Sequence, residues 1–220
     1  MHEVEGAPGH SHEHGHGDEA GRPRLGFVGA GRVGTTLATA FSRAGWTVSA
    51  VASRDNARRA RFQGLVPGAR GFSEPQALTD DAELIFLTVP DDAVAQIAGG
   101  LLLYSGQALV HTSGALPASV LAPAQAAGTS LGSFHPLVAF TDVEQALADL
   151  HGATIALDGD ESLLPLLAEL AEAVGGRPLA GAPAGHPRPR PARPATAEVI
   201  RRHRARWSRR AGRPAPARHR

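Results

Sequence analysis

A glycine-rich turn between a strand and a helix constrains this chain more than any other feature. Residues 25–28 (Leu-Gly-Phe-Val) predict a short buried strand, and residues 35–44 predict a helix that ends at Gly45. Between them runs a G-x-G-x-x-G segment made of Gly29, Ala30, Gly31, Arg32, Val33 and Gly34. In such a segment the first glycine permits a tight turn, the second admits a diphosphate to the backbone N–H groups, and the third allows close helix–strand packing. The setting favours a dinucleotide-binding turn, against the alternative of an ordinary glycine-rich turn in a chain with 26 glycines.

Strand-like and helix-like segments alternate along the following residues. The further predicted strands are 47–52, 83–89, 108–112, 132–140 and 153–157, and the further predicted helices are 55–63, 91–102 and 162–174. This alternation predicts a Rossmann-type, doubly wound α/β fold with a mainly parallel sheet covered on both faces. Because aromatic residues make up only 5% of the chain, we expect a core of Ala, Val and Leu rather than packed rings.

The residues after the second predicted strand bear on the choice of cofactor. An NAD site places Asp or Glu about 20 residues beyond the glycines, whereas this chain has Ser53 and Arg54 there. A hydroxyl and a guanidinium suit a 2′-phosphate, which favours NADP, and Arg58 and Arg59 would reinforce the patch. Asp55 could instead serve as the acidic residue of an NAD site, so NAD stays the less favoured alternative. The alternative for the arginines is that they form a solvent-exposed surface without a ligand.

The strongest predicted strand, 83–89, ends at a second position on the nucleotide side. Its sharp exit through Val89 and Pro90 would leave their backbone beside the cofactor, because ligands of open α/β sheets bind outside the carboxyl ends of the strands. Asp91 or Asp92 follows, and we interpret this pair as a helix N-cap rather than a catalytic group.

Two histidines at predicted strand ends are the candidates for proton transfer. The chain has no Cys and all 22 of its basic residues are Arg, so thiolate and lysine chemistry are excluded. His135 and His111 are the candidate catalytic residues, because imidazole titrates near neutral pH. Ser113 is a candidate for binding a small-molecule substrate. The alternative for each histidine is a hydrogen-bonded core or turn residue.

The chain divides into three predicted regions of different charge and composition. Residues 1–22 are polar and His-rich, residues 23–179 form the dinucleotide-binding domain, and residues 180–220 are rich in Arg and Pro, so both ends are predicted to be disordered. We predict no metal site in the domain, although four alternating histidines offer a weak tract for Zn²⁺, Ni²⁺ or Cu²⁺. These are His10, His12, His14 and His16. The basic tail has the alternative of a nucleic-acid arm, which we consider the less favoured.

Membrane association is not expected from the sequence. No apolar run approaches the roughly 20 residues of a membrane span, and the N-terminus lacks the apolar segment of a signal peptide. We therefore expect a soluble, cytoplasmic protein without a membrane partner.

Taken together, these segments resemble a family of bacterial Rossmann-like proteins that carry "domain of unknown function 2520". The resemblance rests on 25–34, Ser53-Arg54, 87–92, 111–114 and 132–140, and it runs from about Leu25 to Leu179. It implies a kinship with pyrroline-5-carboxylate reductase, the deazaflavin-dependent NADP reductases and the β-hydroxyacid dehydrogenases. The implied activity is hydride transfer to or from a small carbonyl, imine or hydroxy acid.

A His-Pro pair at a similar place in prephenate dehydrogenases, where the histidine contacts substrate, makes His135 the better candidate by analogy. Members of the resembled family continue into a helical domain that closes the substrate site and supports dimerisation. After Leu179 the composition of this chain changes to mostly Arg, Pro, Ala and His. Our hypothesis is that a frameshift has replaced the helical domain. A homodimer is then expected only if the helical domain were intact, and the alternative function is a dinucleotide-binding module without turnover.

Overall fold

The computed structural model describes residues 21–125 and 128–181. The histidine tract between His10 and His16, and the Arg- and Pro-rich segment beyond residue 181, lie outside the described residues. The predictions of disorder, metal capture and a frameshift in those segments therefore stay predictions.

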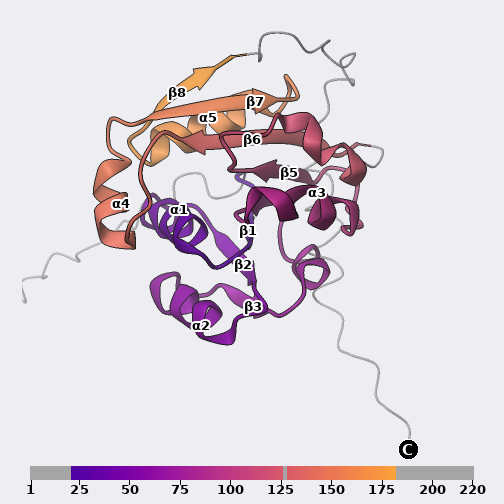
Figure 1. Cartoon of the computed structure of the whole chain (residues 1–220), viewed down its shortest axis with the longest axis horizontal. Helices are drawn as coiled ribbons and strands as arrows, with labels where there is room; N and C mark the ends of the chain where they lie inside the picture. The colour runs from indigo at the N-terminus through magenta and orange to yellow at the C-terminus, as the bar shows by residue number, and fades with distance from the viewer. Residues whose placement is uncertain (1–20, 126–127, 182–220) are drawn as a thin grey trace, which may run out of the picture.

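The described residues form one sheet of eight strands in the order β3-β2-β1-β4-β5-β6-β7-β8 (Figure 1). The strands are β1 (Leu25–Val28), β2 (Val48–Ala52), β3 (Arg70–Phe72), β4 (Leu84–Leu87), β5 (Ala108–His111), β6 (Ser130–Pro136), β7 (Thr154–Gly159) and β8 (Arg177–Ala180). All neighbours pair in parallel except β6 and β7, which are antiparallel. The chain winds outward from β1 to β3 and then returns to β4 on the other side of β1. The predicted doubly wound, mainly parallel α/β fold is confirmed.

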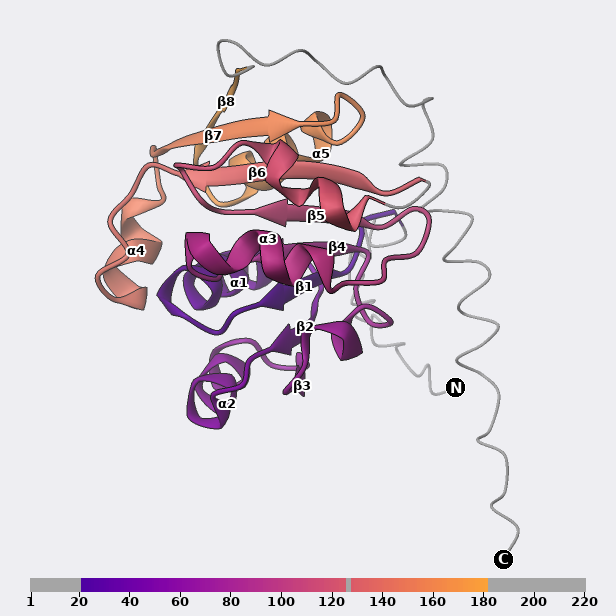
Figure 2. The ribbon, with the colours of Figure 1, turned by 45° about the vertical axis from the view of Figure 1, so that its right-hand side comes forward.

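Helices cover both faces of the sheet (Figure 2). The α-helices are α1 (Arg32–Arg43), α2 (Asn56–Leu65), α3 (Asp91–Gly99), α4 (Val143–Asp149) and α5 (Leu164–Ala173), and the 3₁₀ helices are η1 (Pro75–Leu78) and η2 (Ala118–Ala124). Buried side chains of α1, α2 and α5 pack on one face, and those of α3, η1 and η2 pack on the other. The molecule is therefore a three-layer sandwich, as a parallel sheet with two apolar faces requires.

The core contains packed aromatic rings, so the expectation of an Ala, Val and Leu core is wrong. Five fully buried phenylalanines lie between the sheet and helices α1 and α2. They are Phe27, Phe41, Phe62, Phe86 and Phe134. Phe27 stacks on Phe86 with ring centroids 5.1 Å apart, and Phe134 meets Phe86 edge to face at 5.8 Å. The low aromatic content misled because half of the ten aromatic residues are concentrated in this one cluster.

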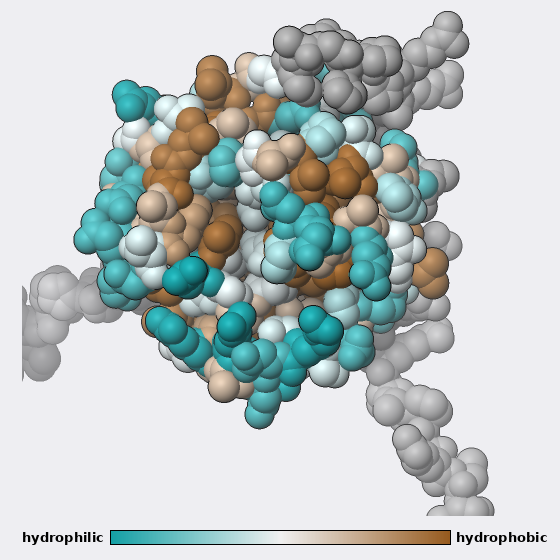
Figure 3. Space-filling view, viewed as in Figure 1, coloured by the Kyte–Doolittle hydropathy of each residue, from teal (hydrophilic) through white to brown (hydrophobic). Residues whose placement is uncertain are grey.

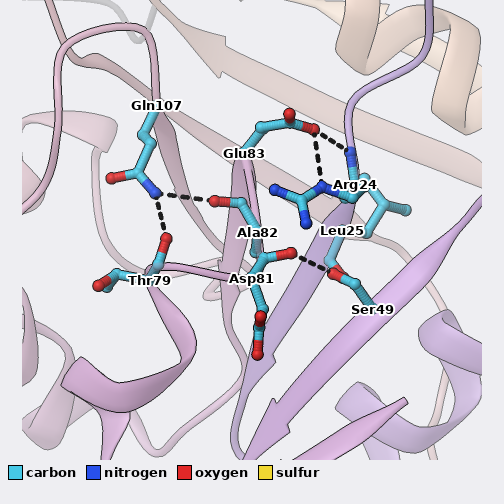
Figure 4. A network of polar contacts seen from close by, with 8 residues as sticks. All are labelled: Arg24, Leu25, Ser49, Thr79, Asp81, Ala82, Glu83 and Gln107. Carbon is cyan, nitrogen blue, oxygen red and sulfur yellow. Dashed lines mark hydrogen bonds and ion pairs between the residues drawn. The ribbon is translucent and has the colours of Figure 1, made fainter. Parts of the chain in front are cut away.

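A polar network ties together the amino ends of the central strands (Figure 4). The side-chain amide of Gln107 donates to the carbonyls of Thr79 at 2.6 Å and Ala82 at 2.8 Å. The Ser49 hydroxyl donates to the carbonyls of Leu25 at 3.1 Å and Asp81 at 2.7 Å. These bonds satisfy backbone carbonyls where β1, β2 and β4 begin. The polar side chains of Gln107 and Ser49 thus have a structural role at this edge of the sheet.

Within the part of the chain that the structure describes, no helix combines the length and apolarity needed to span a membrane.

Candidate functional site

The predicted site residues gather at the carboxyl edge of the sheet. Strands β1, β2, β4, β5 and β6 run in parallel, so their carboxyl ends meet along the same edge. The five predicted segments follow or close these strands in turn: Gly29–Gly34, Ser53-Arg54, Val89-Pro90, residues 111–114, and His135. Ligands of doubly wound sheets bind at this edge, beside the strand at which the order reverses.

Each glycine of the G-x-G-x-x-G turn meets a different steric demand. Gly29 has a φ of 108°, which side chains rarely tolerate, and a Cβ there would lie 2.5 Å from the Thr88 carbonyl oxygen. A Cβ on Gly34 would overlap both the Gly29 carbonyl oxygen and the Thr88 hydroxyl. A Cβ on Gly31, in contrast, would meet nothing within 4 Å. Gly29 and Gly34 therefore build the turn, whereas Gly31 keeps open the space in front of it.

The amino terminus of α1 begins in that open space. The helix starts at Arg32, three residues earlier than predicted, and Gly31 is its N-cap with extended backbone and no side chain to cap it. The first backbone bond of the helix runs from the Thr35 N–H to the Gly31 carbonyl at 2.9 Å. The N–H groups before Thr35 thus have no intrahelical acceptor, and they carry the positive end of the helix dipole. This terminus suits a phosphate group.

The other residues of the turn have structural positions. Ala30 is buried in the core and Val33 packs against it from α1. Arg32 is exposed, and its guanidinium donates to the Thr141 carbonyl at 3.3 Å. Arg32 thereby connects the glycine turn to the segment that follows β6.

Thr88 holds the turn in place, a role that the sequence reasoning missed. It directly follows β4 and is 9% exposed. Its hydroxyl contacts the carbonyls of Gly29 at 2.8 Å and Val28 at 3.2 Å, and its N–H donates to Val28 at 2.8 Å. A hydroxyl residue where a buried apolar strand ends was the available signal.

The arginines after β2 have different surroundings. Arg58 pairs with Asp55 at 3.2 Å, while the guanidinium of Arg59 donates to the Ser53 carbonyl and, at 2.8 Å, to Asn56. Arg54 is exposed, and within the described residues no hydrogen bond or ion pair of its side chain is found. The surface over α2 and β3, at the bottom of Figure 3, is mostly hydrophilic. Arg54 is thus the arginine of this group whose guanidinium is open to a ligand.

Asp55 is the N-cap of α2. Its carboxylate accepts the N–H of Arg58 at 3.0 Å in addition to the ion pair with that side chain. Capping by Asp satisfies one of the open N–H groups of the first turn. The carboxylate that kept NAD open as a cofactor is therefore engaged within its own helix.

The segment after β4 corrects one expectation. Pro90 occupies the N-cap position of α3, and Asp91 and Asp92 lie in the first turn of the helix without a capping bond. The prediction that Asp91 or Asp92 caps the helix is wrong by one to two positions. The proline takes the extended conformation that an N-cap needs, and the carboxylates favour the helix through its dipole. Val89 is partly buried against the core beside it.

His135 lies near the end of β6 and is partly exposed. Its Nδ1 lies 3.0 Å from the Thr112 carbonyl oxygen. Because a carbonyl only accepts, Nδ1 carries the proton, and Nε2 of the neutral ring keeps its lone pair. Gly114 lies against the ring, since a Cβ there would be 2.5 Å from Cε1 of His135. The structure therefore places His135 at the carboxyl edge with one nitrogen anchored and the other available.

His111 closes β5 and is fully buried. Its Nε2 donates to the Pro117 carbonyl at 3.2 Å, while Nδ1 is buried without a hydrogen-bond partner. Burial lowers the pKa of His111 below its ordinary value, although the Pro117 bond and Asp158 act in the opposite direction. These surroundings describe a neutral core histidine.

Ser113 is largely buried, and its hydroxyl oxygen accepts the N–H groups of Ala115 at 3.1 Å and Leu116 at 3.3 Å. The side chain thereby organises the loop that follows β5. Within residues 21–125 and 128–181, no three His, Cys, Asp or Glu side chains gather as metal ligands.

The sequence matches the Rossmann-like domain family over residues 10–136, more than half of the chain. The chain therefore belongs to the Rossmann-like domain family. Among curated proteins, no sequence matches it.

Solved structures share the fold. A Bacteroides fragilis protein named as an NADP oxidoreductase superposes with a TM-score of 0.64 at 18% identity, covering 87% of this chain and 67% of its own. Prephenate dehydrogenase from Aquifex aeolicus, in complex with hydroxyphenyl propionate and NAD⁺, gives 0.61 at 20% identity, covering 73% and 60%. Pyrroline carboxylate reductase from Plasmodium falciparum, with NADP bound, gives 0.55 at 13% identity, covering 74% and 58%. At these identities the likeness establishes the fold, and the chain spans 58 to 67% of the length of these structures.

Proposed function

We propose that this chain is an NADP-dependent oxidoreductase that transfers a hydride to or from a small carbonyl, imine or hydroxy-acid substrate. The observation that carries the proposal is the open space at Gly31, in front of the uncapped amino terminus of α1. A diphosphate fits there because it is an anion and needs close approach to backbone N–H groups. Structures of the same fold with NAD⁺ and with NADP support the cofactor class.

The residues after β2 favour NADP over NAD. Arg54 offers an exposed guanidinium that is not engaged within the described residues, and a guanidinium forms forked, charge-assisted bonds with phosphate. Asp55, the carboxylate that follows Arg54 in the sequence, is engaged by the backbone and side chain of Arg58. A ribose 2′-phosphate would thus meet a free positive charge and a neutralised negative one.

His135 is the better of the two candidate histidines for donating or accepting the proton that accompanies hydride transfer. When bound, the nicotinamide supplies or accepts the hydride, and His135 gives up or takes the accompanying proton at Nε2. Its Nδ1–H is anchored on the Thr112 carbonyl, which leaves Nε2 for a substrate at the carboxyl edge. His111 is fully buried, so we assign it no contact with substrate.

The cofactor assignment is tested by Arg54→Ala, with Arg61→Ala as a control that removes the same charge from the exposed face of α2. Loss of a charge-assisted bond of about 1.5–3 kcal/mol should raise the Kd for NADPH roughly 10- to 150-fold. The Kd for NADH should change less than about 2-fold, since NADH has no 2′-phosphate. Equal losses for both cofactors, or an equal effect of Arg61→Ala, would refute the assignment.

Turnover is tested by screening small carbonyl, imine and hydroxy-acid substrates against NADPH and NADP⁺. We expect turnover that falls about 10²- to 10⁴-fold in His135→Gln, the range typical of general acid–base catalysis. Cofactor binding without any oxidation or reduction would favour a dinucleotide-binding module.

A further inference from the structure

The loop between β5 and η2 touches the imidazole of His135 in two places. The Thr112 carbonyl oxygen lies 3.0 Å from Nδ1, and this hydrogen bond restrains the rotation of the ring about its Cβ–Cγ bond. Gly114 lies against the opposite part of the ring, where a Cβ would be 2.5 Å from Cε1 and 2.8 Å from Cδ2 and would overlap Nε2. The ring therefore occupies the space that any other residue at position 114 would fill.

The same loop is fastened to the protein at several points. The Ser113 hydroxyl accepts the N–H groups of Ala115 at 3.1 Å and Leu116 at 3.3 Å, which closes a tight turn directly after Thr112. At the far end, the Pro117 carbonyl accepts Nε2–H of the fully buried His111 at 3.2 Å. Beyond it, the Ala118 N–H donates to the Asp158 carboxylate at 3.2 Å. The loop cannot shift as a whole without breaking bonds to β5 and β7.

We propose that residues 112–117 form an orienting frame for His135, in which Gly114 and His111 are positioning residues. Gly114 acts by lacking a side chain, and His111 acts by holding Pro117 and thereby the loop. The frame selects the neutral tautomer with the proton on Nδ1, because the Thr112 carbonyl accepts but cannot donate. The Nε2 lone pair is then held in a fixed direction at the carboxyl edge of the sheet. The inference rests on the proposed function only in assigning the proton step to His135.

The direct test is the ¹⁵N NMR signature of the His135 ring, which reports which nitrogen carries the proton. The signal is assigned by its loss in His135→Gln. In the parent protein we expect the Nδ1–H tautomer, and in Gly114→Ala we expect this pattern to be lost as the methyl group displaces the ring. Gly64→Ala in α2 is the matched control, because a Cβ there meets nothing within 4 Å, and it should leave the signature unchanged.

His111 provides a second variant pair that does not depend on the folding of Gly114→Ala. The terminal amide of His111→Gln keeps an N–H donor for the Pro117 carbonyl, whereas His111→Leu removes it. We expect the Nδ1–H pattern of His135 to survive in His111→Gln and to be lost or mixed in His111→Leu. An unchanged His135 tautomer in both Gly114→Ala and His111→Leu would overturn the frame.

Activity separates this inference from the proposed function. In Gly114→Ala we expect kcat to fall about 10²-fold with KM changed less than about 3-fold, since small misplacements of a reacting group cost rate rather than binding. An equal loss in Gly64→Ala would contradict the role of Gly114. If the parent protein shows the Nδ1–H tautomer but turns over no substrate, the proposed function fails while the orienting frame stands.

Discussion

A methyl group added at Gly31 should separate cofactor binding from folding. Gly31 has φ of −77° and ψ of −175°, a conformation open to any residue, and its Cβ would meet nothing within 4 Å. Alanine is a poorer N-cap than glycine, but it also restricts the unfolded chain, and each effect is worth about 0.5–1 kcal/mol. Because these effects oppose one another, Gly31→Ala should change Tm by less than about 3 °C.

The same methyl group lies in the space assigned to the diphosphate. Loss of one charge-assisted hydrogen bond of about 1.5–3 kcal/mol corresponds to a roughly 10- to 150-fold higher Kd for NADPH. Fluorescence titration with NADPH and thermal unfolding on the same samples measure the two effects.

Gly34→Ala is the comparison variant, with the opposite expectation for stability. Its Cβ would overlap the Gly29 carbonyl oxygen and the Thr88 hydroxyl, so the backbone must move. Overpacking of this kind costs about 1–3 kcal/mol, which lowers Tm by roughly 2–12 °C. The reasoning is refuted if Gly31→Ala binds NADPH as tightly as the parent protein, or if Gly34→Ala is as stable.

Three further predictions concern the core and the turn. Burial lowers the pKa of His111 below 6.5, so the folded chain binds fewer protons than the unfolded chain as the pH falls. Its contribution to stability should be complete above about pH 6.5 and decline below it, and urea unfolding of His111→Gln at about pH 5 and 8 should show a weaker pH dependence. Thr88→Val removes the hydroxyl that contacts the carbonyls of Val28 and Gly29. It should lower the free energy of unfolding by about 1–3 kcal/mol in chemical denaturation and weaken NADPH binding, and unchanged values of both would contradict the role of Thr88 in holding the glycine turn. Phe86→Ala, at the centre of the ring cluster, should cost about 3–5 kcal/mol, and a loss below about 1 kcal/mol would show that the rings are not a tight core.

The central strands were predictable because they are buried on both faces. β1 was predicted with its observed bounds, and β4 within two residues, since continuous apolar runs between turn residues have few other solutions. β3 (Arg70–Phe72) and β8 (Arg177–Ala180) are short edge strands with mostly exposed side chains, and so they carry no apolar pattern. Helix α4 has only seven residues, too few for a helical period to show.

The glycine turn of the candidate site was predictable, and the contacts around His135 were not. A strand–glycine–helix spacing is local, so Gly29, Gly31 and Gly34 indicate their roles from sequence alone. The packing of Gly114 against His135 joins residues 21 positions apart through the pairing of β5 with β6. No local pattern encodes such a contact, whereas the engagement of Asp55 by Arg58 three residues on is local and follows from Asp as a helix N-cap.

The central claim is that the amide groups at the start of α1 bind the diphosphate of a nicotinamide dinucleotide while Arg54 binds the 2′-phosphate. Amide ¹H–¹⁵N NMR of the labelled protein, titrated with NADPH and separately with NADH, tests both parts residue by residue. The account predicts that both cofactors produce their largest shifts at Gly31, Arg32 and Val33, and that only NADPH adds a comparable shift at Arg54. Shifts that avoid the glycine turn, or saturation with NADPH that leaves all of these amides unmoved, would contradict it.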